Sequence, residues 1–161
     1  MINATDKQLY LAARLLKEGQ VEECINELSL LLLRYPDHGR GNALMGQVFM
    51  HHFLDYSNAE ACFTKALRFD PLNPTLYSDF AELLILLEKY TEAIAVINKG
   101  FEIPGIEKEK LFRLSGLIHE KQQDFDQAIA FYTDGILQSM SESNIKKLQA
   151  DIQRCMLKKR I

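Results

Sequence analysis

KYTEAIAVINKGFEIP, residues 89–104, is one of four related stretches that decide the fold of this 161-residue chain. The other three are QVEECINELSLLLLRYP at 20–36, DYSNAEACFTKALRFDP at 55–71 and DFDQAIAFYTDGI at 124–136. A small side chain recurs in phase, with successive steps of 35, 34 and 35 residues between Cys24, Ala59, Ala93 and Ala128. A period of this length is typical of arrays of helical repeats, in which each unit buries its apolar face against its neighbours.

Each unit is predicted to contain two antiparallel helices joined by a short turn. In the third unit an i, i+3, i+4, i+7 stripe marks the first helix, with Tyr77, Phe80, Ala81 and Leu84. The inner face of the second helix is expected to carry Ala93, Ile94, Ile97, Gly100 and Phe101. Pro104 and Gly105 follow, and both residue types end helices.

Several of these positions together resemble the tetratricopeptide repeat, a helix–turn–helix unit of about 34 residues. In its register the closing prolines are Pro36, Pro71 and Pro104, and the small first-helix sites are Ala12, Ala81 and Gly116. The second unit has Gln47 at this site and Gly46 beside it, so the close helix contact is expected to be shifted there.

The resemblance implies an all-α fold: a right-handed α-solenoid of four repeats and a C-terminal capping helix, forming a single domain over residues 1–161. The expected boundaries are 5–38, 40–73, 74–107 and 109–142 for the repeats and 144–158 for the capping helix. Ser141 or Ser143 can cap that last helix. Its apolar stripe is predicted to be Ile145, Leu148, Ile152 and Met156.

The composition excludes several function classes. A formal net charge of −3 disfavours nucleic acid as a partner, because phosphate neutralisation needs a basic face. The three cysteines cannot all pair within the chain and are predicted to be free thiols. The N-terminus lacks the pattern of a signal peptide, and no apolar stretch reaches bilayer length. A cytoplasmic protein without membrane contact is therefore expected.

No motif of known chemistry is present. The chain lacks a glycine-rich phosphate loop, a CxxC pair and an HExxH helix. His51 and His52 are adjacent, so on a helix they point about 100° apart and would not share a metal as an i, i+4 pair could. The sequence predicts no cofactor, no metal site and no enzymatic activity.

The resemblance implies that the first helix of each unit lines a concave groove, where a protein or peptide would bind. The predicted partner-binding residues are Leu9, Tyr10, Ala13, Leu44, Met45, Val48, Ser78, Asp79, Glu82, Arg113 and Leu117, with Leu16, His51 and Glu120 at neighbouring inner positions. The groove is thus expected to be apolar in its N-terminal half and charged in its C-terminal half. An apolar strip rimmed by charge is typical of an interaction site.

Some family members clamp the C-terminal carboxylate of heat-shock chaperones with lysine, arginine and asparagine side chains. The matching positions here hold Leu9, Ala13, Met45, Thr75 and Asp79. None of them is a cation, and Asp79 would repel a carboxylate. This form of binding is not predicted for the chain.

A second surface is predicted on the outer side of the first unit. Leu30 and Leu33 occupy positions where the other units carry charged residues such as Lys65 and Lys99. Two exposed leucines would favour covering by the N-terminus, contact with a partner or a weak homodimer, in which the same patch pairs twice.

These patterns favour a non-enzymatic adaptor or co-chaperone that holds a peptide or a partner helix in its groove. Two alternatives stay open. One is a secretion-type chaperone for an exported partner, which this chain resembles in size and acidity. The other is a structural protein whose repeats mediate self-assembly.

Overall fold

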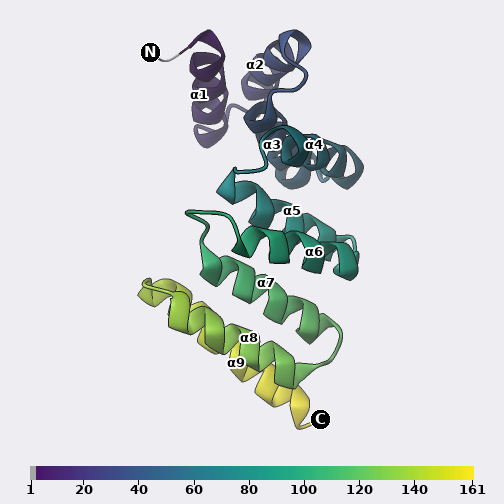
Figure 1. Ribbon diagram of the computed structural model, residues 1–161, viewed down its shortest axis with the longest axis vertical. Helices are drawn as coiled ribbons and strands as arrows, with labels where there is room; N and C mark the ends of the chain where they lie inside the picture. The colour runs from purple at the N-terminus through teal and green to yellow at the C-terminus, as the bar shows by residue number, and fades with distance from the viewer. Residues whose placement is uncertain (1–2) are drawn as a thin grey trace. The chain divides into compact units, whose positions relative to one another are not determined.

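The computed structural model describes residues 3–161, and all regular structure in that range is helical (Figure 1). It consists of nine α-helices and one π-helical turn within the described residues: α1 (Ala4–Lys17), α2 (Val21–Arg34), α3 (Gly39–Val48), η1 (Phe49–Phe53), α4 (Tyr56–Phe69), α5 (Pro74–Leu86), α6 (Tyr90–Phe101), α7 (Lys108–Lys121), α8 (Phe125–Gln138) and α9 (Glu142–Lys159). The predicted all-α fold is confirmed. No helix in the described range combines the length and apolar character needed to cross a bilayer.

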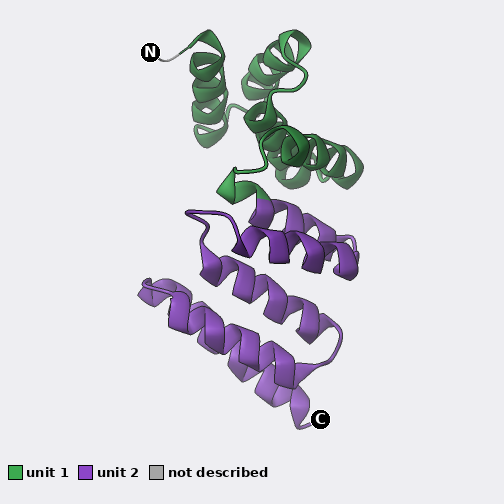
Figure 2. Ribbon diagram, viewed as in Figure 1, with its two compact units in different colours: residues 1–76 green, residues 77–161 purple. Residues whose placement is uncertain are grey.

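The helices form two compact units, residues 1–76 and 77–161, with the boundary inside α5 (Figure 2). In the first unit α1 packs on α2 and α3 packs on α4. Its core contains Ala12, Cys24, Leu28, Met45 and Val48. In the second unit α8 packs on both α7 and α9, and a buried cluster contains Ala128, Tyr132, Leu148 and Cys155.

The helix starts follow local capping rules. Asn3 Oδ1 accepts a hydrogen bond from the Asp6 backbone at 2.7 Å, and Asp55 and Asp124 cap α4 and α8 in the same way. Ser141 rather than Ser143 caps α9. Each cap binds one backbone N–H that has no partner inside its helix.

The turn inside every repeat contains a residue with left-handed backbone geometry, two places before the second helix begins. These residues are Gly19, Leu54, Glu88 and Gln123, with φ of 81°, 53°, 58° and 64°. Glycine adopts this geometry freely, whereas a side chain is strained in it. Three of the four repeats therefore close their turn with a strained residue.

Two glycines fix how the helices of the second and fourth repeats pack. A Cβ at Gly46 would lie 2.7 Å from the Phe63 ring, and one at Gly116 would lie 2.5 Å from the Tyr132 ring. Only a residue without a side chain allows such contact. The shift predicted for the second unit is confirmed, because Gly46 rather than Gln47 makes the close contact.

The shift at Gly46 explains the π-helical turn. Gly46 precedes Ala59 by 13 residues, whereas 12 residues separate the equivalent pairs, such as Gly116 and Ala128. A π-helical turn accommodates one extra residue within a helix. The turn η1 directly follows α3, so the insertion is absorbed before α4 begins.

Two predicted helix faces differ by one residue from the observed ones. On α6 Ile94 is 38% exposed, while Val96 and Ile97 are buried beside Ala93. On α9 Met156 is 40% exposed and Cys155 is fully buried. Neighbouring helical residues point about 100° apart, so Ile94 and Met156 each turn away from the core that their neighbours Ala93 and Cys155 enter.

Candidate interaction site

The predicted inner-face residues of α5 and α7 meet around one cavity in the second unit. Its volume is about 280 Å³. The walls of this cavity, the α5–α7 pocket, are Ser78, Asp79, Glu82, Lys110, Arg113, Leu114, Leu117, Tyr132, Asp151 and Arg154. All five residues predicted for the C-terminal half of the groove line it.

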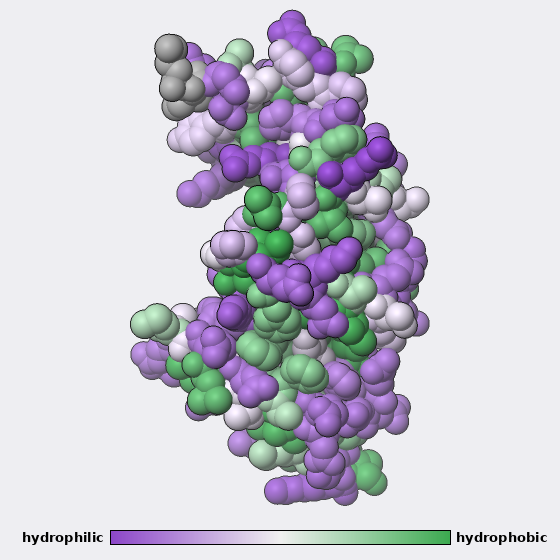
Figure 3. All heavy atoms as spheres, viewed as in Figure 1, coloured by the Kyte–Doolittle hydropathy of each residue, from purple (hydrophilic) through white to green (hydrophobic). Residues whose placement is uncertain are grey.

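The pocket carries opposite charges on different helices. Asp79 and Glu82 come from α5, whereas Lys110 and Arg113 come from α7. Leu114 and Leu117 contribute apolar surface to the same pocket. Figure 3 shows a similar mixture of hydrophilic and hydrophobic residues over the visible face of both units. The pocket therefore offers two signs of charge together with apolar surface.

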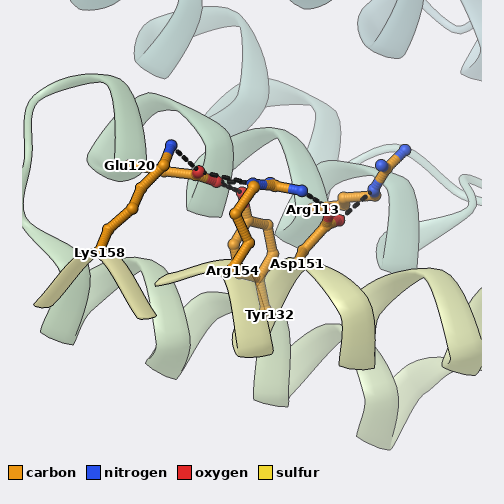
Figure 4. A network of polar contacts seen from close by, with 6 residues as sticks. All are labelled: Arg113, Glu120, Tyr132, Asp151, Arg154 and Lys158. Atoms are coloured by element: carbon orange, nitrogen blue, oxygen red, sulfur yellow. Dashed lines mark hydrogen bonds and ion pairs between the residues drawn. The ribbon is translucent and has the colours of Figure 1, made fainter. Parts of the chain in front are cut away.

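Asp151 of α9 holds Arg113 in place. Its carboxylate is only 5% exposed and accepts hydrogen bonds from Arg113 Nε at 2.7 Å and from Arg154 Nη1 at 2.8 Å (Figure 4). The bond to Asp151 raises the pKa of Arg113 above its usual value. A buried acid with two cationic partners is stable only as a complete network, because an uncompensated buried charge is costly.

Glu120 of α7 forms the second half of this network. It accepts hydrogen bonds from Arg154 Nε at 2.7 Å and Nη2 at 2.6 Å, from Lys158 Nζ at 2.8 Å and from the Tyr132 hydroxyl at 2.9 Å. The Arg154 bonds are the main reason why the pKa of Glu120 lies well below its usual value. Burial, followed by the bond to Glu120, raises the pKa of Tyr132. The network ties α7, α8 and α9 together.

The position of Glu120 corrects a prediction. It was expected at an exposed inner position, but it is 6% exposed beneath α9. The contacts of Tyr132, Asp151, Arg154 and Lys158 with this network were not predicted from the sequence. One signal was available: Leu148, Asp151 and Cys155 follow an i, i+3, i+7 spacing, which places an acid on the buried face of α9. A buried acid requires a cation nearby.

The inner-face residues of the first unit surround a second cavity, of about 360 Å³. Leu9, Ala13 and Leu44 line it together with Arg40, Ala43, Gln47, Asp70 and Thr75. Tyr10 is 72% exposed and does not line this cavity. Leu16 packs against the core, and His51 lies exposed in η1.

The predicted exposure of Met45 and Val48 was wrong, since both are buried in the core of the first unit. The reason is the register shift at Gly46. Counted from Gly46, Met45 corresponds to Phe80 and Val48 to Leu83 in the third repeat, and both of these are also buried. Ala43 and Gln47 take the inner positions instead.

The predicted exposure of Leu30 and Leu33 is confirmed at 58% and 83%. Both lie on α2. Their role in self-association stays a prediction. Among the described residues no group of three or more His, Cys, Asp or Glu side chains could hold a metal ion.

Comparison with known proteins supports the repeat assignment. No protein-family model matches the chain. Human tetratricopeptide repeat protein 13 is 26% identical over 131 residues, which is 76% of this chain and 14% of that protein. Drosophila melanogaster protein O-mannosyl-transferase Tmtc3 is 26% identical over 71 residues, 44% of this chain and 8% of that protein. The chain thus spans less than a sixth of either relative.

Solved structures show the same fold. Pseudomonas aeruginosa PilF superposes with a TM-score of 0.85 at 18% identity, covering 98% of this chain and 69% of that one. The tetratricopeptide-repeat protein TTC0263 of Thermus thermophilus gives 0.74 at 16% identity, covering 96% and 82%. The TPR2B domain of yeast Sti1, solved as a pHsp70 complex, gives 0.66 at 17% identity, covering 74% and 97%. The chain has the tetratricopeptide-repeat fold, as its repeat pattern predicted.

Proposed function

We propose that this chain is a protein–protein interaction module that holds a peptide or a partner helix against the inner-face residues of its first helices. The observation that carries the proposal is the α5–α7 pocket, which residues of four helices line and which combines both signs of charge with the apolar side chains of Leu114 and Leu117. Ligand sites typically combine apolar surface with a few well-placed polar groups. The yeast Sti1 domain of the same fold, solved as a pHsp70 complex, supports this use of the fold.

Within this class the adaptor or co-chaperone role is our first choice. A pocket of about 280 Å³ has room for one or two side chains rather than a whole ligand. Such a pocket suits recognition of an extended or helical partner segment, with further contacts outside it. We retain the predictions that the partner is a protein, that nucleic acid is not bound and that the chain is not an enzyme.

The test is selection of short peptides from a random library by the purified chain, followed by binding measurements. The Leu117→Gln variant should bind the selected peptides at least about tenfold more weakly, because it removes apolar surface from the pocket. Leu137→Gln is the matched control, since Leu137 is 76% exposed on α8 and outside the pocket. Circular dichroism confirms that both variants fold. Failure to select any peptide, or equal binding by Leu117→Gln, would contradict the proposal.

A second candidate function, self-association, is favoured by the exposure of Leu30 and Leu33 on α2. Covering two leucines gives a small apolar nucleus, and association costs translational and rotational freedom. A weak dimer is therefore expected. Sedimentation equilibrium should show a concentration-dependent dimer that Leu30→Lys with Leu33→Glu abolishes. A wild-type chain that stays monomeric at every concentration would exclude it.

A further inference from the structure

Two charged groups face the α5–α7 pocket from different helices without neutralising each other. Glu82 on α5 is exposed and forms no ion pair with any described residue. Arg113 on α7 donates only its Nε to Asp151, and neither Nη group bonds to a described residue. Figure 4 shows the end of the Arg113 side chain directed away from Asp151.

The Arg113 side chain is fixed in one orientation before any ligand binds. The Asp151 carboxylate that anchors it is 5% exposed and is itself fixed by Arg154, which also binds Glu120. The Arg113 guanidinium therefore has a fixed stem and two terminal donor groups, while its side chain remains 52% exposed. A planar guanidinium with two such donors matches a carboxylate in a bidentate pair. Fixing the donor before binding reduces the entropy lost on association.

The surroundings of Glu82 and Arg113 exclude a uniformly charged ligand. An anionic polymer that satisfied Arg113 and Lys110 would also meet the Glu82 carboxylate in the same pocket. A cationic one would meet Arg113 and Lys110. Leu114 and Leu117, which also line the pocket, favour an apolar side chain. A ligand that is complementary to this pocket therefore carries both signs of charge.

We infer that the α5–α7 pocket recognises a partner segment in which an apolar side chain lies between a carboxylate and a cation. Arg113 binds the carboxylate, Glu82 binds the cation, and the apolar side chain contacts Leu114 and Leu117. This inference rests on the proposed function and adds the partner chemistry to it. The two charges also fix the direction in which the segment lies, because the reversed segment would place like charges together.

The test uses synthetic peptides of neutral residues with a central leucine, flanked at several spacings by Glu and Lys, by two Glu, by two Lys or by two Gln. The peptide with one Glu and one Lys should bind about tenfold more tightly than the other three at the best spacing. Arg113→Gln should remove about tenfold of this affinity, and Asp151 keeps Arg154 as a partner in that variant. Arg160→Gln, an exposed arginine at the end of α9, is the matched control.

Charge reversal provides the sharper experiment. Glu82→Lys should lower the affinity for the Glu–Leu–Lys peptide about fivefold and raise the affinity for the Glu–Leu–Glu peptide by a similar factor. Glu102→Lys makes the same exchange at an exposed residue following α6 and should change neither. Because Glu82 is exposed and unpaired with any described residue, the folded state should tolerate this change.

The outcomes separate the inference from the proposed function. If library peptides bind through Leu117 but Glu82→Lys does not alter the charge preference, the module binds peptides and the inference is wrong. Strongest binding by the peptide with two Glu, or by one with two Lys, also overturns it. If no peptide binds at all, the proposed function fails first.

Discussion

The second and fourth repeats pack an aromatic ring on a glycine in the same way, yet they surround that ring differently. Phe63 contacts Gly46 and Tyr132 contacts Gly116 at equivalent positions, four residues after Ala59 and Ala128. Four residues after each glycine stands Met50 in one repeat and Glu120 in the other. Both are buried, at 2% and 6% exposure. The two repeats thus share the packing of a ring on a glycine, but the buried residue beside the ring is apolar in one repeat and charged in the other.

The difference follows from what each repeat packs against. In the fourth repeat α9 supplies Arg154 and Lys158 to Glu120, and the Tyr132 hydroxyl completes the set. A buried glutamate is tolerable there because each of these partners donates to it. Phe63 and Met50 have no group that could take part in such a network. The comparison shows that a repeat can keep its backbone geometry while its core changes from apolar to ionic.

The largest expected effect on stability comes from replacing Glu120 of the fourth repeat by methionine, the residue at the equivalent position of the second repeat. Glu120→Met should destabilise the second unit by about 2–4 kcal/mol, because Arg154, Lys158 and the Tyr132 hydroxyl lose their shared acceptor. We expect less than the full cost of an unpaired buried charge, because the Arg154 side chain is 43% exposed and can be hydrated when Glu120 is absent. Urea unfolding followed by circular dichroism and by alkylation of Cys155 measures the effect.

Cys155 suits this measurement because it is fully buried and its pKa is raised, chiefly by burial, to about 11. It should react only when the second unit opens, and Cys24, which is equally buried, reports on the first unit. Combining Glu120→Met with Tyr132→Phe should recover part of the lost stability, because the hydroxyl that has lost its acceptor is then absent. A single Glu120→Met variant as stable as the wild type would show that the network contributes nothing to the fold.

Among the substitutions, the two glycines give the next largest effect. Gly116→Ala should destabilise the second unit by about 1–2 kcal/mol, the overpacking cost being partly offset by the better helix propensity of alanine. Gly46→Ala should cost less, because the hydrogen bond from the Tyr132 hydroxyl to Glu120 limits how far that ring can move, whereas a phenylalanine ring has no hydroxyl group to form such a bond.

Second-site changes sharpen this comparison. Phe63→Leu should rescue Gly46→Ala, since it reproduces the Ala12 and Leu28 pairing of the first repeat. Tyr132→Leu should rescue Gly116→Ala less well, because it also removes a donor to Glu120. Thermal unfolding of the four variants and their parents measures both couplings. Equal rescue in the two repeats would contradict the proposed difference.

Acidification should weaken the second unit through Glu120. Its native pKa is lowered, so its stabilising effect is fully present above the ordinary glutamate value near 4.3 and is lost as the pH falls below it. The expected loss is about 2 kcal/mol by pH 3. In Glu120→Gln this contribution should be absent. Unfolding at pH 6 and pH 3 compares the two chains, and parallel losses would assign the acid sensitivity to other carboxylates.

The smallest effect concerns the strained turns. Leu54→Asn should stabilise the first unit by about 0.5–1 kcal/mol, because asparagine tolerates the left-handed geometry and Leu54, 64% exposed, contributes little packing. Gln123→Asn should do the same for the second unit to a similar or smaller extent. Gly19→Ala in the corresponding turn of the first repeat should instead be destabilising. A lower melting temperature for Leu54→Asn would mean that the leucine side chain is needed there.

Which first-helix residues face inward was predicted by counting from the small first-helix site of each repeat, so the prediction depends on identifying that site. In the second unit the register is clear, because Ala81 and Gly116 lie at the small first-helix site, and the inner-face residues line one pocket: Ser78, Asp79, Glu82, Arg113 and Leu117. Their role in partner binding stays a prediction. Met45 and Val48 were misplaced because the sequence offers both Gly46 and Gln47 for that site. Only the packing of Phe63 on Gly46 decides between them.

By itself the sequence determined the local and periodic properties of this protein. Recurring small residues, prolines and helix caps set the number, order and approximate ends of the helices, because these depend on interactions within a few residues. The tertiary structure alone decided which polar side chains meet. Glu120 and Arg154 are 34 residues apart and Arg113 and Asp151 are 38 apart, so no local pattern reveals their contacts. Those contacts depend on how α7, α8 and α9 pack, and they hold Arg113 in the wall of the α5–α7 pocket.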